Sequence, residues 1–172
     1  MINTHKIKGF TLLELILTLA LTGTVTLAIF SFFLSSYQTF SMSNDQIEVQ
    51  NQAQIAISKF IEPIMWATEI ADINSENSNL EFIELEKLTL KTGDEYNQFV
   101  FDKAQKKLMY AVNQNQNHLS PTVYATNIIS VQYKELKDKH NNIIGLGIKV
   151  VSEVKESKVE IENEIYFRNK IK

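Results

Sequence analysis

Two groups of closely spaced carboxylates are the first candidates for chemistry in this sequence. The first group is Glu81, Glu84 and Glu86, and the second is Glu160, Glu162 and Glu164. Carboxylates at alternate positions of a strand point to the same face of a sheet, where their oxygens can hold a cation such as calcium. More often such a row forms the solvated side of a half-buried sheet. We expect the solvated role here, with a cation site as the alternative.

Other reactive side chains are few. The 172 residues include no cysteine, which excludes disulfides and thiolate metal sites. The three histidines, His5, His118 and His140, are scattered among polar neighbours, as expected for solvated loops. No phosphate-binding glycine loop, nucleophile elbow or metal-ligand spacing is present. The sequence therefore predicts no catalytic residue, no cofactor and no metal centre, and a protein that is not an enzyme.

One carboxylate interrupts the most apolar segment of the chain. Residues 10–34 read FTLLELILTLALTGTVTLAIFSFFL, and Glu14 is their single charge. About 20 apolar residues rising 1.5 Å each match roughly 30 Å of hydrocarbon, so this segment can span a bilayer as a helix. Lys6 and Lys8 precede it, and the next basic residue is Lys59. This asymmetry predicts a single-pass protein of the cytoplasmic membrane with its N-terminus inside.

The position of Glu14 indicates a function. A carboxylate at the centre of a bilayer costs about 2.5–3.5 kcal/mol on insertion scales, and such residues normally have a partner. Opposite charges 4 Å apart attract by about 4 kcal/mol at an effective dielectric of 20, before desolvation is counted. A cation on a neighbouring molecule would therefore favour one axial register between the two helices.

The segment Lys8-Gly9-Phe10-Thr11-Leu12-Leu13-Glu14 resembles the N-terminal segment of type IV prepilins, including the pseudopilins of type II secretion and competence systems. The resemblance implies that a membrane-embedded prepilin peptidase cuts between Gly9 and Phe10, and that the same enzyme methylates the new amine of Phe10. It also implies that Glu14 meets the N-terminal amine of a neighbouring subunit during assembly. Glycine suits the cleavage position because it has no side chain to obstruct a narrow active site.

Two weaker resemblances indicate which class of subunit within this family the chain is most similar to. Gln50-Asn51-Gln52-Ala53 and Ile165-Tyr166-Phe167-Arg168-Asn169 resemble segments of the minor pseudopilins of the J and W types. A long polar insertion, Gln114–His118, suits a subunit used in small number, so we favour a minor subunit over a major one. The sequence leaves open which system the subunit serves: adhesion and motility, protein secretion or DNA uptake.

The segment around Gly23 allows two interpretations. Residues 22–26, Thr-Gly-Thr-Val-Thr, are poor helix formers. In related filaments a nearby stretch loses helicity when subunits leave the membrane. Alternatively the helix is continuous and its threonine hydroxyls bond back to the backbone.

The pattern of the chain predicts an α+β fold. We divide it into a leader (1–9), a transmembrane assembly helix (10–34), an extracytoplasmic continuation of that helix (35–71) and a β-rich, pilin-like domain (72–172). An apolar stripe on the helix should pack on the sheet; its members are Ala53, Ile57, Phe60, Ile61 and Ile64. Pro63 should kink or end this helix near Glu62, with a further turn or two reaching Ile70.

The remaining elements follow from alternation and turn residues. Expected strands are 80–91, 99–101, 108–112, 128–136, 143–154 and 159–167, with a loop at 92–97. We expect Trp66 to anchor the helix on the sheet. Five other aromatic residues should pack in the core rather than form an adhesive surface; they are Tyr96, Phe99, Tyr110, Tyr124 and Tyr133.

These observations favour a structural subunit of a pilus or pseudopilus. Its expected partners are the prepilin peptidase, other subunits and membrane lipid. The charge is nearly balanced at −3, which gives no general attraction to nucleic acid, and the composition neither indicates nor excludes a nucleic-acid partner. The alternative is a monomeric, membrane-anchored extracytoplasmic binding domain.

Overall fold

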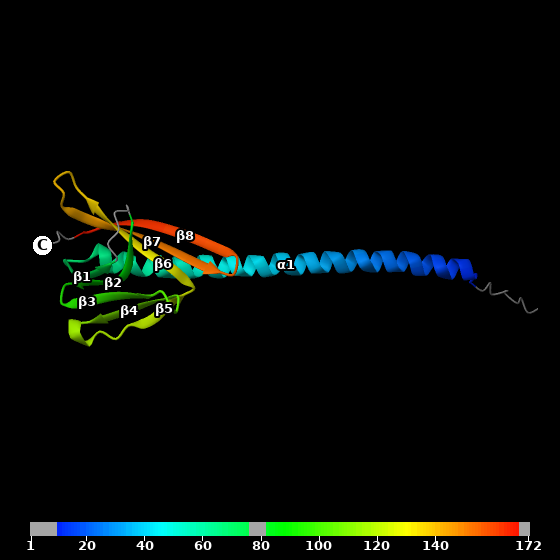
Figure 1. Cartoon of the computed structure of the whole chain (residues 1–172), viewed down its shortest axis with the longest axis horizontal. Helices are drawn as coiled ribbons and strands as arrows, with labels where there is room; N and C mark the ends of the chain where they lie inside the picture. The colour runs from blue at the N-terminus through cyan, green and yellow to red at the C-terminus, as the bar shows by residue number, and fades with distance from the viewer. Residues whose placement is uncertain (1–9, 76–81, 169–172) are drawn as a thin grey trace, which may run out of the picture. The chain divides into compact units, whose positions relative to one another are not determined.

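The computed structural model describes residues 10–75 and 82–168, and all that follows concerns these residues. They form an α+β protein with one long helix and an antiparallel sheet, which confirms the expected fold class (Figure 1). The chain divides into two compact units after Ser43, within the helix. The first unit holds the apolar part of the helix. The second unit, here called the domain, holds the rest of the helix and all the strands.

Helix α1 runs from Leu12 to Met65. It passes through Pro63 and ends at Met65, three residues after the expected end near Glu62 and before Ile70, which further turns were expected to reach. Proline removes one backbone N–H, but Trp66 N donates to Glu62 O at 3.1 Å, so helical bonding resumes at once. The proline ring is itself buried in the domain. The bond that proline cannot form is the one to the carbonyl of Lys59, so a single helical bond is lost close to the end of the helix.

Eight strands follow the helix. They are β1 (Glu69–Ser75), β2 (Ile83–Thr92), β3 (Glu95–Asp102), β4 (Lys107–Asn113), β5 (Thr122–Thr126), β6 (Ile128–Lys137), β7 (Ile143–Val154) and β8 (Ser157–Tyr166). The order in the sheet is β5-β4-β3-β2-β6-β7-β8, and β1 pairs with β2 beside this path. All pairings are antiparallel. A short 3-10 helix, η1 (Gln116–His118), lies in the polar link between β4 and β5.

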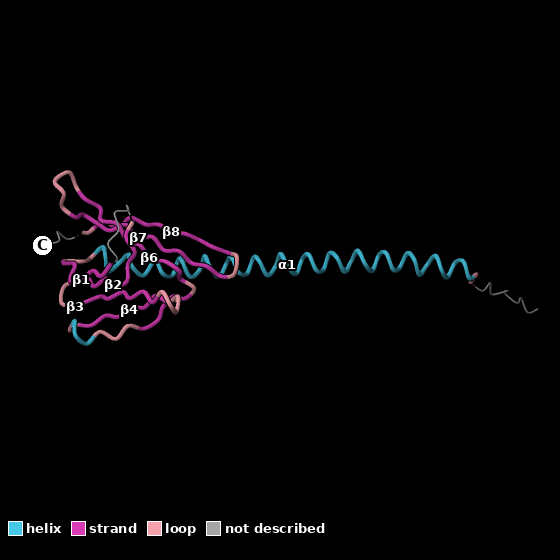
Figure 2. The backbone as a smooth tube through the Cα atoms, in the orientation of Figure 1, coloured by secondary structure: helices cyan, strands magenta, loops and turns pink. Residues whose placement is uncertain are grey.

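Short turns join most neighbouring strands (Figure 2). Only Gly93 and Asp94 separate β2 from β3, so the loop expected at 92–97 is mostly strand. Gly93 has a φ of 62°, which glycine adopts without steric cost. The link between β6 and β7 is organised by Asp138, whose carboxylate accepts hydrogen bonds from the side chain and backbone of Asn142. These bonds lower the pKa of Asp138.

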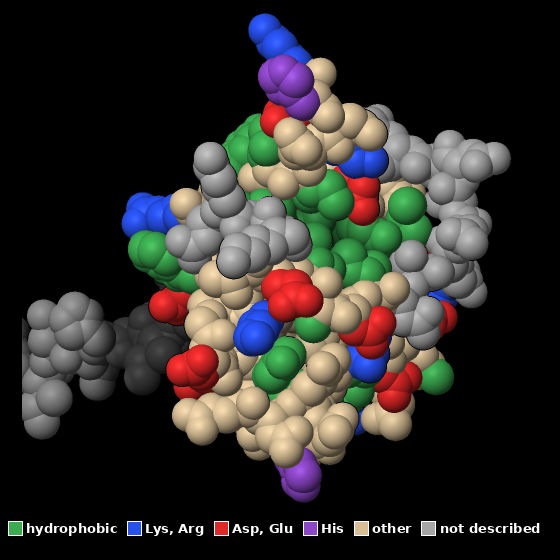
Figure 3. Space-filling model, turned by 90° about the vertical axis from the view of Figure 1, so that its left-hand side faces the viewer, with side chains coloured by type: hydrophobic (Ala, Val, Ile, Leu, Met, Phe, Trp, Pro, Cys, Tyr) green, Lys and Arg blue, Asp and Glu red, His purple; other side chains and the backbone are tan. Residues whose placement is uncertain are grey.

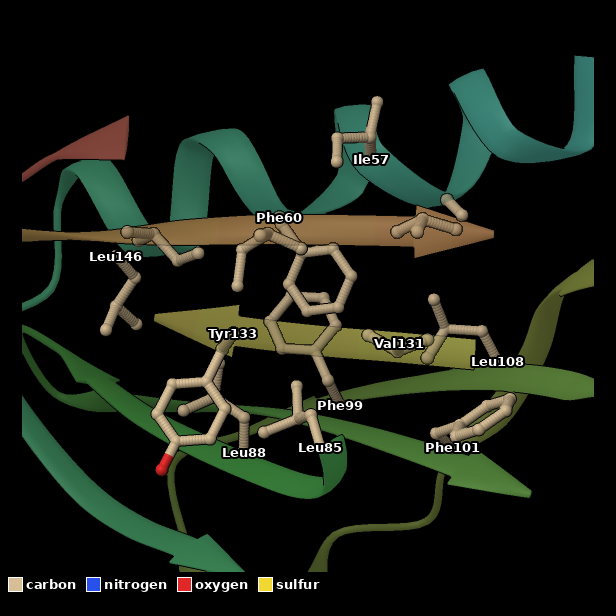
Figure 4. Close-up of a cluster of buried hydrophobic side chains, with 14 of the residues drawn as sticks. Ile57, Phe60, Leu85, Leu88, Phe99, Phe101, Leu108, Val131, Tyr133 and Leu146 are labelled. Carbon is tan, nitrogen blue, oxygen red and sulfur yellow. The ribbon is translucent and has the colours of Figure 1, made fainter. Parts of the chain in front are cut away.

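The core lies between the domain part of α1 and one face of the sheet (Figure 4). Phe60 is fully buried, and its ring stacks on Phe99 of β3 with centroids 4.2 Å apart. The buried face of the helix begins at Val49, one turn before the predicted stripe. Ile61 is 36% exposed, so its assignment to the stripe is wrong. The other members of the stripe are buried as predicted.

Polar side chains fix the first turns of the domain helix to two strand connections. Gln52 Oε1 accepts the backbone N–H of Thr126 at 2.9 Å, at the end of β5. About two turns earlier, Asp45 forms an ion pair of 2.8 Å with Lys155 in the turn between β7 and β8. The helix is therefore held at this end by directional bonds in addition to apolar packing.

Two strands were not expected from the sequence. Residues 69–75 form β1, although the helical continuation was expected to reach Ile70, and residues 122–126 form β5. Thr68 N donates to Lys91 O at 2.8 Å and starts the pairing of β1 with β2. The expected role of Trp66 as an anchor of the helix on the sheet stays a prediction. Trp66 is 39% exposed, and the guanidinium of Arg168 lies 4.9 Å from its ring centroid.

Candidate functional site

The apolar part of α1 is the first feature that needs a partner. Between residues 10 and 34 every large hydrophobic side chain is at least 46% exposed, and Phe10 is 78% exposed. By length and composition the helix can cross a membrane, and none of its most apolar stretch is buried within the protein. A helix that is apolar on all sides requires lipid or other apolar helices around it. The length, composition and exposure of this helix are therefore consistent with the membrane anchor expected from the sequence.

Glu14 lies in the first turn of this helix and closes a reciprocal cap. Its backbone N donates to Thr11 Oγ1 at 3.3 Å, and its Oε2 accepts from Thr11 N at 3.4 Å and from Thr11 Oγ1 at 3.5 Å. This is the capping box that a Ser/Thr-x-x-Glu sequence forms at a helix start, where backbone N–H groups lack partners. Sequence reasoning singled out Glu14 and missed Thr11, although the T-x-x-E spacing was the available signal.

Of the two residues at the predicted cleavage site, Gly9 and Phe10, the structure describes only Phe10. Gly9 lies outside the described residues. Phe10 directly precedes the cap and is highly exposed. Phe10 therefore lies just before the start of α1, and Glu14 lies in the first turn of the same helix.

The helix is continuous through Gly23. The hydroxyls of Thr22 and Thr26 donate to the backbone oxygens four residues earlier, at 2.7 and 2.8 Å, and Thr24 donates three residues back at 2.8 Å. A side chain at Gly23 would meet nothing within 4 Å. The back-bonded helix is thus the form seen here, and a loss of helicity on assembly stays a prediction.

The second group of carboxylates, Glu160, Glu162 and Glu164, forms ion pairs with lysines of the neighbouring strands. Lys134 of β6 lies 2.9 Å from both Glu162 and Glu164 of β8, and Lys149 of β7 lies 2.7 Å from Glu160. Hydrogen bonds from Lys134 and Tyr166 lower the pKa of Glu164, and the two glutamates raise the pKa of Lys134. Cross-strand ion pairs thus account for this row as the solvated side of the sheet.

Lys134 reaches β8 by crossing over β7 at a glycine. A Cβ placed on Gly147 would lie 2.6 Å from Lys134 Cγ and Cε. The absence of a side chain at Gly147 therefore opens the path of the lysine. Sequence reasoning named the glutamates but gave no sign of the lysine that joins them, because the pairing depends on strand order.

The other carboxylate group is partly described. Glu81 lies outside the described residues, Glu84 forms a 3.0 Å ion pair with Lys103, and Glu86 lines an open cavity of about 450 Å³. Val100 and Met109 contribute apolar surface to this cavity. Acidic and basic side chains are interspersed on the face of the domain in Figure 3. Within residues 10–75 and 82–168 no three His, Asp or Glu side chains are arranged to hold a metal ion.

Four of the five aromatic residues singled out above lie in the core or pack against it, whereas Tyr96 is half-buried outside the core cluster, with Lys91 over its ring. Phe99 and Tyr133 are buried. Tyr110 packs against Phe99 with centroids 5.0 Å apart, and Tyr124 meets Tyr110 edge-on at 6.3 Å. Burial raises the pKa of the Tyr124 phenol. Lys59 of α1 lies over the ring of Tyr110 at 4.4 Å, so the helix also contributes a cation to this cluster.

Comparison of the chain with protein-family models, with curated proteins and with solved structures finds no match. The assignment of function therefore depends on the residues and geometry described above.

Proposed function

We propose that the chain is a subunit, in the minor class, of a type IV pilus-like filament or a type II secretion or competence pseudopilus. In this proposal prepilin peptidase cleaves between Gly9 and Phe10 and methylates Phe10. The subunit then joins a bundle of similar helices through residues 10–34. Before processing it is a single-pass protein of the cytoplasmic membrane, and afterwards it is part of an extracytoplasmic filament.

One observation carries the proposal: a carboxylate at the head of a helix segment that is apolar and exposed on every side. Lipid alone would cover the apolar side chains but would leave the Glu14 charge uncompensated. A neighbouring helix whose own N-terminus is a free amine supplies both apolar contact and a cation. The attraction selects one stagger between neighbours because only one places the amine beside the carboxylate. The Lys8–Glu14 resemblance to prepilins points to the same chemistry.

Two measurements test the proposal. Intact mass spectrometry of the chain from native membranes or filaments should show loss of residues 1–9 and one methyl group on Phe10. Glu14→Gln should abolish incorporation into filaments, because glutamine can keep the capping box but removes the charge. Thr18→Ala is the matched control, since it removes from the same helix a hydroxyl that bonds to Leu15 O and leaves the charge of Glu14 in place.

The outcomes separate the proposal from its alternative. A chain that still begins at Met1 and stays monomeric in the membrane would identify an anchored binding domain. A Glu14→Gln chain that assembles as well as wild type would remove the register mechanism, whatever the state of the N-terminus.

A further inference from the structure

We propose that the cavity lined by Glu86, Val100 and Met109 binds a lysine or arginine side chain carried by an extended segment of a partner protein. The cavity is formed by β2, β3, β4 and the turn between β3 and β4, and no residue of α1 lines it. The inference therefore does not depend on the role proposed for Glu14.

The cavity forms where β2 and β3 separate. Their ladder ends at Lys87, which pairs with Val100, and β2 then continues to a pairing with β6. Glu86 is an extra residue at this point, because the register of β1 with β2 skips it. Such a bulge bends a strand and redirects its side chains. The separation leaves an open space of about 450 Å³, which lies within the usual size range of ligand pockets.

A row of apolar side chains leads from the cavity to the edge of the sheet. Val100 pairs with Met109, and Met109 pairs with Val123 of the edge strand β5. Phe99 faces the core, so Val100 and the residues opposite it lie on the other face of the sheet. Strands lie about 4.8 Å apart, which gives the row a length of about 14 Å from Lys87 to Val123.

The length of this row favours a polypeptide over a small cation. An extended segment of about four residues spans the same distance. The far end of the row is open, since Val123 is 46% exposed. A small amine in the cavity would leave this apolar end uncovered, whereas a segment with an apolar residue beyond its basic residue covers both ends.

The charges in the cavity favour a cation. Lys103 forms an ion pair of 3.0 Å with Glu84, and Lys87 forms one of 2.8 Å with a carboxylate of β1. Each lysine of the cavity is thus matched by a carboxylate, and Glu86 and Asp102 add two further negative charges to the lining. The apolar stem of a lysine or arginine side chain can lie along Val100 while its charged end meets these carboxylates.

The test measures peptide binding to the full chain in detergent micelles at constant ionic strength. The reporter is the methyl signal of Met109 in NMR spectra of methionine-labelled protein, identified with Met109→Leu. The probes are acetyl-Arg-Ser-Ser-Leu-amide, its counterpart acetyl-Glu-Ser-Ser-Leu-amide, and n-hexylammonium as a free cation with an apolar stem.

Four variants separate the parts of the site. Asp102→Asn removes one charge and can keep the bond that Asp102 accepts from Gln105 N. Glu86→Gln repeats the test at a second carboxylate. Val123→Thr replaces the exposed apolar end of the row by a polar side chain of similar shape. Glu160→Gln is the matched control, because it removes the same charge from β8, outside the cavity.

We expect the arginine peptide to shift the Met109 signal and to bind more tightly than the glutamate peptide, by roughly 5-fold or more. Asp102→Asn and Glu86→Gln should each weaken the arginine peptide by roughly 2- to 5-fold, the range of one exposed ion pair. Val123→Thr should weaken this peptide and leave n-hexylammonium unchanged, and Glu160→Gln should behave as wild type.

Two results would overturn the inference. One is an unshifted Met109 signal at about 10 mM arginine peptide, a concentration that nearly saturates a site with a Kd of about 1 mM, or equal affinity for the two peptides. The other is binding of n-hexylammonium as tight as that of the arginine peptide with no effect of Val123→Thr, which would identify a site for a free organic cation. Normal assembly of Glu14→Gln would remove the proposed register mechanism and leave all these expectations in place.

Discussion

Two glycines of β7 provide a matched pair for testing the packing of the sheet. Gly145 and Gly147 lie two residues apart on one strand and face the same side of the sheet. A Cβ on Gly145 would lie 2.4 Å from the backbone oxygen of Ile165 and 3.0 Å from Tyr166 Cα. A Cβ on Gly147 would instead meet the flexible side chain of Lys134.

The expected energies follow from what must move. Non-bonded atoms are most stable near 3.5–4.0 Å, so Gly145→Ala must displace β8 by about 1 Å. Ile165 is 5% exposed, which means that the displacement reaches the core. Overpacking of this kind costs about 1–3 kcal/mol. For Gly147→Ala the clash begins at Lys134 Cγ, so this side chain must change its rotamer and give up its ion pairs with Glu162 and Glu164, while alanine restricts the unfolded chain and contributes about 0.4–1 kcal/mol. We expect this variant to stay within about 1 kcal/mol of wild type.

Thermal unfolding of the full chain in detergent micelles is a suitable assay. The sequence contains one tryptophan, Trp66, which lies at the end of α1 in the domain and reports on it by fluorescence. Each kcal/mol lowers the melting temperature by roughly 2–8 °C for domains of this size. A Gly145→Ala chain that melts at or above the temperature of Gly147→Ala would show that the close approach of β7 and β8 at Gly145 is wrong.

Three further predictions concern the domain. Phe60→Ala should lower the free energy of unfolding by about 3–5 kcal/mol because it leaves a cavity at the centre of the core. Ile61→Ala, at the next position of the helix, should change the free energy of unfolding by no more than about 0.5 kcal/mol. Chemical denaturation of the two variants tests the difference. Lys134→Met should raise the pKa of Glu164 toward its ordinary 4.5, as measured by NMR titration. Because the folded-state pKa of Glu164 is lowered, its stabilising contribution is present above pH 4.5 and is lost as the pH falls through the folded value, so the variant should be less sensitive to acid in that range. Gln52→Ala should cost about 1 kcal/mol in a melting experiment, because a backbone N–H at the end of β5 loses its acceptor.

Sequence periodicity predicted the elements that bury one clear face. The stripe from Ala53 to Ile64 packs on the sheet because apolar residues at steps of three and four form one face of a helix, and burying that face against the sheet removes it from water. In β8 the alternation of glutamates with apolar residues gave the two faces correctly, since the period of a strand is fixed at two.

Other elements depend on contacts that no local pattern contains. Residues 69–75 read EIADINS, with apolar residues three apart, and so suit a last helical turn as well as a strand. Pairing with β2 decides between these outcomes, as strand formation depends strongly on neighbouring strands. The ion pairs of Lys134 were equally hidden, because they require β6, β7 and β8 to be adjacent and a glycine to lie between them.

The first unit exposes its apolar side chains, whereas the domain buries its own core, so variants in the two units should affect assembly and folding separately. None of the residues from Phe10 to Ser43 is buried, whereas the core of the domain begins at Val49 and is complete within the described strands and helix. Loss of the Glu14 charge therefore removes no contact from that core, and Glu14→Gln should leave the melting temperature of the domain unchanged while it abolishes assembly. Phe60→Ala should lower the melting temperature of the domain and, at temperatures below its own melting point, should leave assembly unchanged. If Glu14→Gln lowered the melting temperature as well, its assembly defect would have to be assigned to misfolding, and the carboxylate would lose its separate role.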